Sequence, residues 1–418
     1  MTDGDGTSGT GGRIPERLAG AGWLLDPALR RLFDALGRDD ARVVGGAVRN
    51  ALIGLPVQDV DIATRLPPEE VMRRARAAGF SVHPVGIDHG SVLVARGGRT
   101  YEVTTLRRDV ETDGRHARVA FTDDWEADAR RRDFTMNALY ADAEGNVYDP
   151  LGGLPDARAR RVRFIGDARR RIREDFLRIL RFFRFWAQYA DGDPDPEALD
   201  AISELRDGLS RISRERIREE MRRLLTAPRA VEAMLHMANA GVLDHVVPGN
   251  CRRDFEALAR MATDDDRHAL PPDWLLRIAA FCGPQPELKD ALRLSRREAG
   301  RLEKLRRIGR LPDSGREWRA LAWRESVEAA RDIARHAHAA GRIDDRAFAE
   351  ALAALRDWTP PVFPLTGKDA IAAGVAPGPA VGQILRRVQD RWIAGDFRPA
   401  SREELLALLK RIVEEPEA

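Results

Sequence analysis

The chain has 418 residues, which is long enough for two or more domains that each have their own hydrophobic core. Its 69 basic and 67 acidic residues leave a net charge of only +2, so the strongly basic and strongly acidic classes of protein are excluded. Its two cysteines are too few for a disulfide framework or a zinc-finger array, and they fit a reducing compartment. No apolar run approaches the roughly 18 residues of a membrane span, so we expect a cytoplasmic protein with no membrane partner.

The first third of the chain predicts mixed α/β structure. Residues 1–23 begin with MTDGDGTSGTGG, which has no signal-peptide pattern and predicts a flexible leader. After it, patterns of helical period alternate with short apolar runs typical of strands. Helices are expected at 27–36, 47–54 and 69–79, and strands at 41–46, 57–64, 91–97 and 99–106. We expect one sheet with flanking helices over residues 24–155.

The rest of the chain predicts helices. Strand signals become rare after residue 153, and residues 167 to about 358 show successive amphipathic patterns. The segment WTPPVFP, residues 358–364, is the strongest linker signal, because consecutive prolines resist helix formation. We therefore expect an all-α region that is divided near residue 358.

Two carboxylates lie within the predicted strand 57–64. In a strand, Asp59 and Asp61 share one face while Val60 points into the core. Two anions this close repel each other unless a cation lies between them, and Mg²⁺ binds through one or two carboxylates together with water and substrate phosphates. Taken alone, such a pair is more typical of a solvated strand end, so the neighbouring motifs decide its interpretation.

Three further residues favour a phosphate site beside this pair. Gly46 lies at a predicted strand–helix turn whose backbone N–H groups can approach phosphate, and Arg49 adds a positive charge one turn later. Glu102 lies in the middle of a predicted strand, where an unpaired charge would be costly. It is either the partner of an arginine or a third catalytic carboxylate, acting as a metal ligand or as the base that deprotonates an attacking hydroxyl.

The segments GGAVRNALIGLPVQDVDIAT, from residue 45, and ARRRDFTMNAL, residues 129–139, resemble the class II nucleotidyltransferase family. This family comprises the tRNA CCA-adding enzymes and the bacterial poly(A) polymerases. The resemblance implies an α+β fold, with a polymerase-β-like head (24–155, a mixed sheet with flanking helices) followed by an all-α neck (156–225), body (226–358) and tail (359–418).

Site residues follow from the same motifs. The resemblance implies that Asp59 and Asp61 bind Mg²⁺ in a two-ion site, and that Gly46, Arg49 and Arg132 contact the nucleotide. One departure is Asn50, where the family usually has Asp after the arginine. It weakens any charged role at position 50 and leaves the metal pair intact.

The segment REDFLRILRFFRFW, residues 173–186, bears on the choice of nucleotide. At helical spacing its apolar side chains share one face and its arginines the other, as in any surface helix. Asp175 lies one turn before Arg178 and offers an acceptor beside a donor. Adenine and cytosine present an exocyclic amine next to a bare ring nitrogen, so this pair fits A and C and leaves groups unpaired against G and U. The family resemblance assigns the same role to EDxxR, with Arg181 and Arg184 as further nucleotide contacts.

Two later segments have a structural and a functional interpretation. The segment RISRERIREEMRRLL, residues 211–225, alternates in charge and favours a structural helix, and the resemblance implies that it supports the nucleotide pocket. The Gly/Pro turn and basic helix of residues 364–392 fit either a packing turn or a phosphate contact with tRNA.

The choice within the family depends on residues 84–94. Bacterial poly(A) polymerases tend to have a basic GRRFxLxHV-type stretch there, whereas this chain has PVGIDHGSVLV. We therefore expect a Mg²⁺-dependent enzyme that adds C, C and A to a tRNA 3′ end from CTP and ATP, by in-line attack of the RNA 3′-hydroxyl on the α-phosphate. No obligate protein partner is inferred. The alternatives are a poly(A) polymerase, an enzyme that adds only A or only CC, and a non-catalytic RNA-binding protein.

Overall fold

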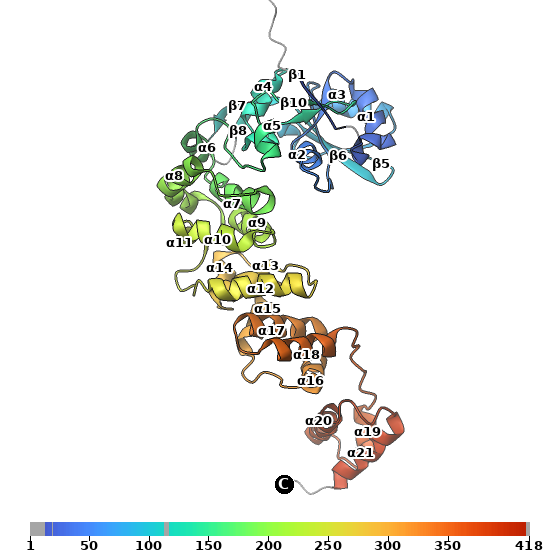
Figure 1. The fold of residues 1–418 in the computed structure, drawn as a ribbon. Helices are drawn as coiled ribbons and strands as arrows, with labels where there is room; N and C mark the ends of the chain where they lie inside the picture. The colour runs from blue at the N-terminus through green and yellow to red at the C-terminus, as the bar shows by residue number, and fades with distance from the viewer. Residues whose placement is uncertain (1–12, 19, 113–116, 415–418) are drawn as a thin grey trace, which may run out of the picture. The chain divides into compact units, whose positions relative to one another are not determined.

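The computed structural model describes residues 13–18, 20–112 and 117–414, which form two compact units, residues 1–246 and 247–418 (Figure 1). The first unit contains a mixed sheet and the helices that follow it. The second contains helices alone in its described part. The α+β fold expected from the sequence is confirmed. The two units meet at 246/247, and the expected head, neck, body and tail boundaries stay a prediction.

The sheet has eight strands in the order β1-β10-β9-β2-β3-β6-β5-β4. Neighbouring strands are antiparallel except β3 and β6, which are parallel and pair Asp61 with Glu102. A separate hairpin is formed by β7 and β8. The strands are β1 (Arg13–Arg17), β2 (Ala41–Val44), β3 (Asp61–Thr64), β4 (Ser81–Pro84), β5 (Ser91–Arg96), β6 (Arg99–Thr105), β7 (Arg107–Thr112), β8 (Ala117–Phe121), β9 (Tyr140–Ala141) and β10 (Asn146–Tyr148).

The expected flexible leader needs a correction. Residues 1–12 lie outside the described residues, but Arg13–Arg17 form β1, which pairs with β10 at the edge of the sheet. The sequence RIPER gives no alternating apolar pattern, so its place in the sheet comes from backbone pairing with β10 and could not be inferred from periodicity.

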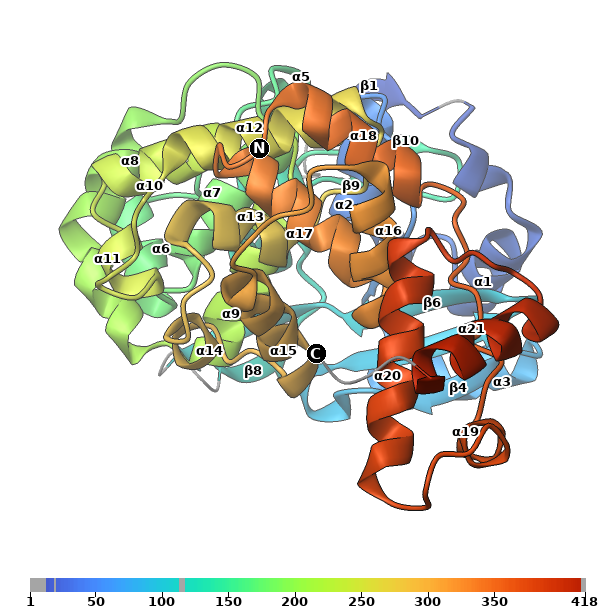
Figure 2. The same cartoon turned by 90° about the horizontal axis from the view of Figure 1, so that it is seen from below.

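The sheet is covered by helices whose ends follow from local chemistry. Asp26 accepts a hydrogen bond from the Ala28 backbone N–H, and Pro27 occupies the first position of α1 (Pro27–Leu36). One face of α1 is buried, and α1 packs against α3 (Pro68–Ala77), which covers β4, β5 and β6 (Figure 2). The buried residues of α1 are Leu29, Leu32, Phe33 and Leu36. The other helices of this region are α2 (Gly46–Leu52), α4 (Trp125–Arg130) and α5 (Leu154–Arg158).

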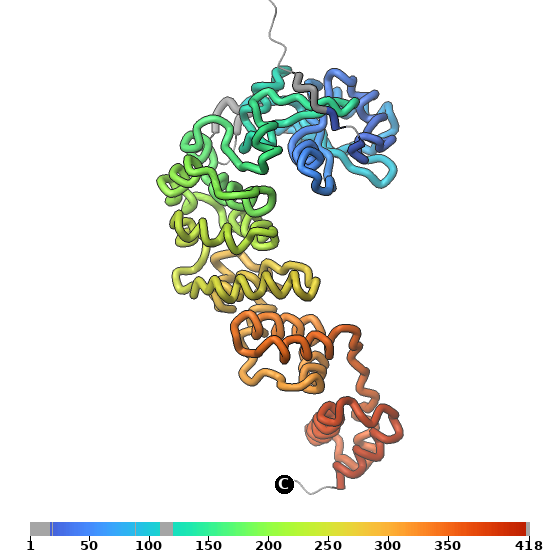
Figure 3. The backbone as a smooth tube through the Cα atoms, viewed as in Figure 1, coloured from blue at the N-terminus to red at the C-terminus, as the bar shows by residue number. Residues whose placement is uncertain are grey.

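The remaining helices of the first unit pack on one another (Figure 3). The helix α7 (Arg178–Tyr189) is central, because it contacts α6 (Ala168–Glu174), α9 (Arg214–Leu225) and α10 (Ala230–Asn239). It is buried almost all round, including Arg178 and Arg184, so the alternative of an ordinary surface helix does not hold. The others are α8 (Pro196–Leu205) and α11 (Leu243–Val246), with short 3₁₀ turns η1 (Gly22–Leu25), η2 (Ile87–His89), η3 (Thr135–Asn137) and η4 (Arg206–Arg211).

The second unit begins with a loop held by a disulfide. Cys251 and Cys282 are bonded, with their Cα atoms 4.3 Å apart, and this bond ties the loop before α12 to the end of α13. The expectation that the cysteines fit a reducing compartment is therefore not supported. The helices are α12 (Phe255–Arg267), α13 (Trp274–Cys282), α14 (Leu288–Ala291), α15 (Arg296–Arg307), α16 (Gly315–Arg324), α17 (Val327–Ala339), α18 (Asp345–Leu355), α19 (Gly367–Ala372), α20 (Pro379–Ala394) and α21 (Arg402–Glu414).

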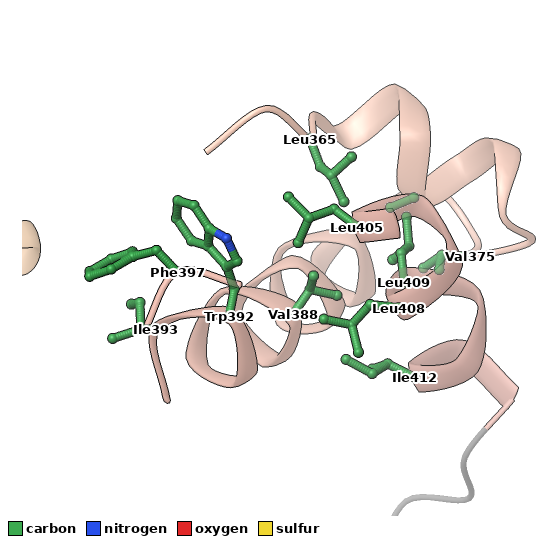
Figure 4. Packing of buried hydrophobic residues seen from close by; sticks show 11 residues of the cluster. Leu365, Val375, Val388, Trp392, Ile393, Phe397, Leu405, Leu408, Leu409 and Ile412 are labelled. Atoms are coloured by element: carbon green, nitrogen blue, oxygen red, sulfur yellow. The ribbon is translucent and has the colours of Figure 1, made fainter. Parts of the chain in front are cut away.

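The last three helices share an apolar cluster of their own (Figure 4). Trp392 lies in this cluster at 2 % exposure, and its indole N–H donates to the Pro399 carbonyl. Arg319 of α16 forms a two-point ion pair with Asp396, which joins this cluster to the rest of the second unit. Among the described residues, no helix is both long and apolar enough to cross a membrane.

Candidate active site

The turn between β2 and α2 contributes Gly45 and Gly46 to the lining of a cleft of about 470 Å³. Gly45 has φ of +71°, a conformation that side chains rarely adopt, and its N–H donates to the Leu139 carbonyl. Gly46 begins α2, and Arg49 follows one turn later. All three line the cleft, and their contact with phosphate stays a prediction.

The two carboxylates of the DxD motif lie at the start of β3. The strand begins at Asp61, so Asp59 lies in the preceding loop rather than in the strand as expected. Their side chains are exposed while Val60 is buried at 9 % exposure, which agrees with the predicted alternation. Although Asp61 reaches solvent, the surrounding protein shields part of its carboxylate from water and raises its pKa. Nearby Glu102 and Asp59 add to the rise, and Arg132 opposes it.

Glu102 stands beside Asp61 in the parallel pairing of β3 and β6. Its side chain is exposed, so the expectation of a costly buried charge at this position is wrong. Among the described residues, no three His, Cys, Asp or Glu side chains are grouped closely enough to hold a metal ion. The role of Glu102 as a third ligand or as a base stays a prediction.

The DxD pair nevertheless fits a divalent cation by its donor chemistry. Within the described structure, the side chains of Asp59 and Asp61 make no hydrogen bond or ion pair, so their carboxylate oxygens are available as ligands. Burial is the main cause of the raised pKa of Asp61, and a cation would relieve the smaller contributions of the Glu102 and Asp59 charges. Mg²⁺ is the hard ion that such oxygens and nucleotide phosphates share.

Arg132 is held at the cleft by a buried carboxylate. Its Nη2 donates to Asp128 Oδ2 at 2.9 Å, and the Tyr140 hydroxyl donates to the same oxygen at 2.8 Å. Burial alone would raise the pKa of Asp128, but Arg132 and Arg131 lower it to about 2. Asp128 is therefore ionised at neutral pH and fixes the direction of the Arg132 guanidinium.

The helical conformation is interrupted at Asp175, between α6 and α7. Asp175 has φ of −155°, so it ends α6 in extended conformation, and Arg178 begins α7. The expected continuous helix over 173–186 is therefore wrong. One Asp175 oxygen accepts from the Leu177 N–H at 3.1 Å, and the other accepts from Arg216 Nη2 at 2.6 Å.

Arg178 and Arg181 share Asp133 of the RRDF motif. Arg178 Nε donates to Asp133 Oδ1 at 2.9 Å, and Arg181 Nε donates to Oδ2 at 2.5 Å. Arg178 Nη1 also donates to the Arg171 carbonyl at 2.6 Å and to Glu174 at 2.7 Å. Both arginines line the cleft in fixed orientations.

Arg184 lies outside the cleft lining. Its Nε donates to Glu220 Oε2 at 2.5 Å, and both side chains are buried. Glu220 also pairs with Arg181 at 3.7 Å. Arg184 therefore does not form part of the cleft wall; it binds Glu220, which in turn pairs with the cleft residue Arg181.

The structure brings together most of the residues singled out in the sequence. The cleft lining contains seven of them, and three others, Asp59, Glu102 and Arg184, are not part of it. The seven are Gly46, Arg49, Asp61, Arg132, Asp175, Arg178 and Arg181. Sequence reasoning missed Asp128, Asp133, Asn137, Arg216 and Glu220, which hold the guanidinium and carboxylate groups of the cleft. Spacing gave one signal, because Arg216 and Glu220 lie four residues apart on one face of α9.

Comparisons with known proteins agree with this geometry. The family model "Poly A polymerase head domain" matches residues 41–163, and "Probable RNA and SrmB- binding site of polymerase A" matches residues 193–251. The mitochondrial CCA tRNA nucleotidyltransferase 1 of Mus musculus is 32% identical over 400 residues, which cover 93% of this chain and 91% of the relative. The CCA-adding enzyme of Lacticaseibacillus paracasei is 30% identical over 372 residues, 88% of this chain and 91% of the relative.

Solved structures give the same result. The Bacillus stearothermophilus CCA-adding enzyme in complex with CTP superposes with a TM-score of 0.68 at 29% identity, over 92% of this chain and 98% of that chain. The Thermotoga maritima CCA-adding enzyme complexed with tRNA shares the fold, with a TM-score of 0.66 at 20% identity over 96% and 99% of the two chains. The chain belongs to the class II nucleotidyltransferases, the family of the CCA-adding enzymes.

Proposed function

We propose that this protein adds C, C and A to the 3′ end of tRNA, with CTP and ATP as substrates. The observation that carries the proposal is the cleft that joins the β2–α2 turn and Asp61 of the sheet to Asp175 and Arg178 of the helices. It combines a phosphate site, a metal-binding carboxylate and an acceptor beside a donor within one cavity. The relatives that resemble this chain over most of their length are CCA-adding enzymes, which supports the same reaction.

Base choice is assigned to Asp175 and Arg178. The Asp175 carboxylate has lone pairs left after its bonds to Leu177 N–H and Arg216, so it can accept from the exocyclic amine of cytosine or adenine. Arg178 is fixed through its Nε and Nη1, and its Nη2 would donate to the bare ring nitrogen. Guanine and uracil offer a carbonyl and a ring N–H at these places, so both pairs would fail.

The transfer step is assigned to the DxD side of the cleft. Nucleotidyltransferases of this family generally use a divalent metal ion, and Asp59 and Asp61 would hold Mg²⁺. When bound, the ion would lower the pKa of the RNA 3′-hydroxyl and neutralise charge on the leaving pyrophosphate. Gly46, Arg49 and Arg132 would orient the triphosphate for in-line attack. The turn before α20 would contact tRNA through its backbone N–H groups.

The experiment uses three tRNA transcripts that end before CCA, after one C and after both. The full-length protein and Mg²⁺ are incubated with each nucleotide alone and with all four together, and the 3′ ends are sequenced. We expect ordered addition of C, C and A that then stops. Long A tails would instead indicate a poly(A) polymerase. Addition of A alone or of CC alone would indicate that a second enzyme completes the CCA end.

Matched variants test the metal pair in the same assay. Asp59→Asn and Asp61→Asn keep the size of the side chain and remove the ligand charge, so transfer should fall at least about 100-fold while tRNA affinity changes little. Asp123→Asn, at an exposed position outside the cleft, is the control. Near-full activity of both DxD variants would refute the proposed metal site.

A further inference from the structure

Arg171 lies in α6, is buried at 3 % exposure and is not part of the cleft lining. Its Nη2 donates to the Arg131 carbonyl at 2.7 Å and to the Arg132 carbonyl at 2.5 Å. Its Nη1 donates to the Glu174 carboxylate, one turn later in the same helix. A buried guanidinium therefore ties α6 to the backbone of the RRDF segment, residues 131–134.

The same residue supports Arg178, which begins α7. The Arg171 carbonyl accepts from Arg178 Nη1 at 2.6 Å, and Glu174 accepts from the same nitrogen at 2.7 Å. One acceptor is thus the peptide group of Arg171, and the other is the carboxylate that the Arg171 side chain binds. The direction of the Arg178 guanidinium therefore depends on where Arg171 is anchored.

The two carbonyls that Arg171 binds need a donor from outside their own helix. The helix α4 ends at Arg130, and the last carbonyl groups of a helix have no partner within it. Leaving such groups unpaired in a buried segment is costly. A guanidinium has five N–H donors in one plane, so it can serve two carbonyls and a carboxylate at once, which the compact ammonium of lysine does less well.

The contacts of Arg171 connect two parts of the cleft that act on one nucleotide. Arg132 is assigned to the triphosphate and Arg178 to the base, so a bound nucleotide would touch both. A displacement of about 1 Å between groups that act on the same substrate can lower a rate about 100-fold. The relative position of Arg132 and Arg178 should therefore be important for transfer and for base choice.

We propose that Arg171 is a positioning residue, which touches no nucleotide itself and holds Arg178 in register with the RRDF segment. The inference rests on the proposed function in one respect, namely that Arg178 reads the base of CTP or ATP. It adds a residue outside the cleft on which base selection depends.

The test compares Arg171→Met with Arg170→Met, its neighbour in α6. Methionine keeps an unbranched apolar side chain and removes the guanidinium. The Arg170 side chain is 76 % exposed and pairs with Glu174 at 3.5 Å, so its loss removes the same charge and a Glu174 contact but leaves the two carbonyl contacts. We expect kcat for addition of C and A to tRNA to fall by at least about tenfold in Arg171→Met and by less than about twofold in Arg170→Met.

Nucleotide binding without tRNA tests the inference independently of the addition reaction. Isothermal titration calorimetry of the full-length protein with each nucleotide gives the preference for CTP over UTP and for ATP over GTP. Both preferences should fall by at least about tenfold in Arg171→Met and stay unchanged in Arg170→Met. In Arg171→Lys they should fall about threefold, because the ammonium can still donate to the carbonyls.

A double-mutant cycle shows whether Arg171 acts through Arg178. The variant Arg178→Met lacks the donor that Arg171 would position, so adding Arg171→Met to it should change the remaining preferences by less than about twofold. A general loosening of α6 would instead give the same loss with or without Arg178.

The outcomes distinguish failure of the inference from failure of the proposed function. Loss of preference in Arg171→Met that disappears in the Arg178→Met background supports the inference, even if the wild-type protein adds neither C nor A to tRNA. Wild-type preference in Arg171→Met overturns it, whatever the addition assay shows. An equal loss in Arg170→Met, or a wild type without any preference, also overturns it. If Arg171→Met does not fold, Arg171→Lys takes its place, and wild-type preference in that variant overturns the inference.

Discussion

At the scale of single residues, ion pairs hold most of the charged side chains of the cleft in place. Asp175, assigned to base choice, has one oxygen on a backbone N–H and the other on Arg216. Arg216 is half-exposed and lies on α9, outside the motif that contains Asp175. Together with the backbone N–H, Arg216 holds both oxygens of the Asp175 carboxylate. Base selection should therefore depend on Arg216 as well as on Asp175.

We therefore predict that Asp175→Asn and Arg216→Met both relax base selection. The rejection of UTP and GTP relative to CTP and ATP should fall by at least about tenfold in Asp175→Asn, since the amide can donate where the carboxylate could only accept. Arg216→Met should have a smaller effect of the same kind, because Asp175 stays in place but is free to turn. Single-turnover kinetics with each nucleotide measure both effects.

The control for this prediction lies on the same helix. Arg223 pairs with Glu219 on the exposed side of α9, so Arg223→Met should leave selection unchanged. Equal selectivity of Asp175→Asn and wild type would contradict the assignment of Asp175. Loss of selectivity in Arg223→Met would show that base selection depends on the stability of α9 as a whole and not on the Arg216 contact.

At the scale of elements, the position of η3 depends on close backbone packing. The loop before α5 is held by Asp149, whose two oxygens accept from the Gly153 and Leu154 N–H groups, each at 2.8 Å. A Cβ on Gly153 would lie 2.1 Å from the Thr135 carbonyl oxygen, where no flexible side chain can yield. Thr135 begins η3, which carries Asn137, so this contact sets one wall of the cleft.

Gly153→Ala should therefore lower the free energy of unfolding by about 1–3 kcal/mol. The added methyl group must push η3 away, so nucleotide affinity should fall with stability. Urea unfolding followed by tryptophan fluorescence measures the first effect. Gly22→Ala, where a Cβ meets nothing within 4 Å, should change stability by less than about 0.5 kcal/mol. Wild-type stability of Gly153→Ala would show that the loop can move without cost.

At the scale of the whole molecule, a buried histidine should make the second unit sensitive to acid. His336 of the second unit is 8 % exposed, and burial lowers its pKa to about 4, against an opposing backbone hydrogen bond with Ala279. In the unfolded chain its pKa is about 6.5. The unfolded state therefore binds the proton first, so this contribution to stability is complete above pH 6.5 and is lost as the pH falls toward 4.

We predict that His336→Gln removes part of this pH dependence. Gln can keep a hydrogen bond but does not titrate, so the loss of stability of the second unit between pH 6.5 and 4 should shrink by up to about 3 kcal/mol. Denaturant unfolding at several pH values measures it. His83→Gln, at an exposed position in the first unit, should keep the wild-type profile of the second unit. An unchanged profile in His336→Gln would assign the acid response to other groups.

The sequence by itself determined the local features of this protein. Hydrophobic period predicted α1, α3 and the strands β2, β3, β5 and β6, because this signal depends on neighbours along the chain. Ordered motifs predicted the family and half of the residues that line the cleft, including Asp61, Arg132 and Asp175. Short strands without an apolar pattern, such as β1, could not be predicted, since they are fixed by pairing with distant strands.

Only the tertiary structure decided which charges are neutralised. Asp133 meets Arg178 and Arg181 across 45 and 48 residues, and Glu220 meets Arg184 across 36. Ion pairs of this kind depend on the packing of α7 against α9 and against the RRDF segment, and no spacing in the sequence encodes them. The structure alone therefore distinguishes the arginines that pair with carboxylates from Arg49, whose neighbours are two amide oxygens and two aromatic rings.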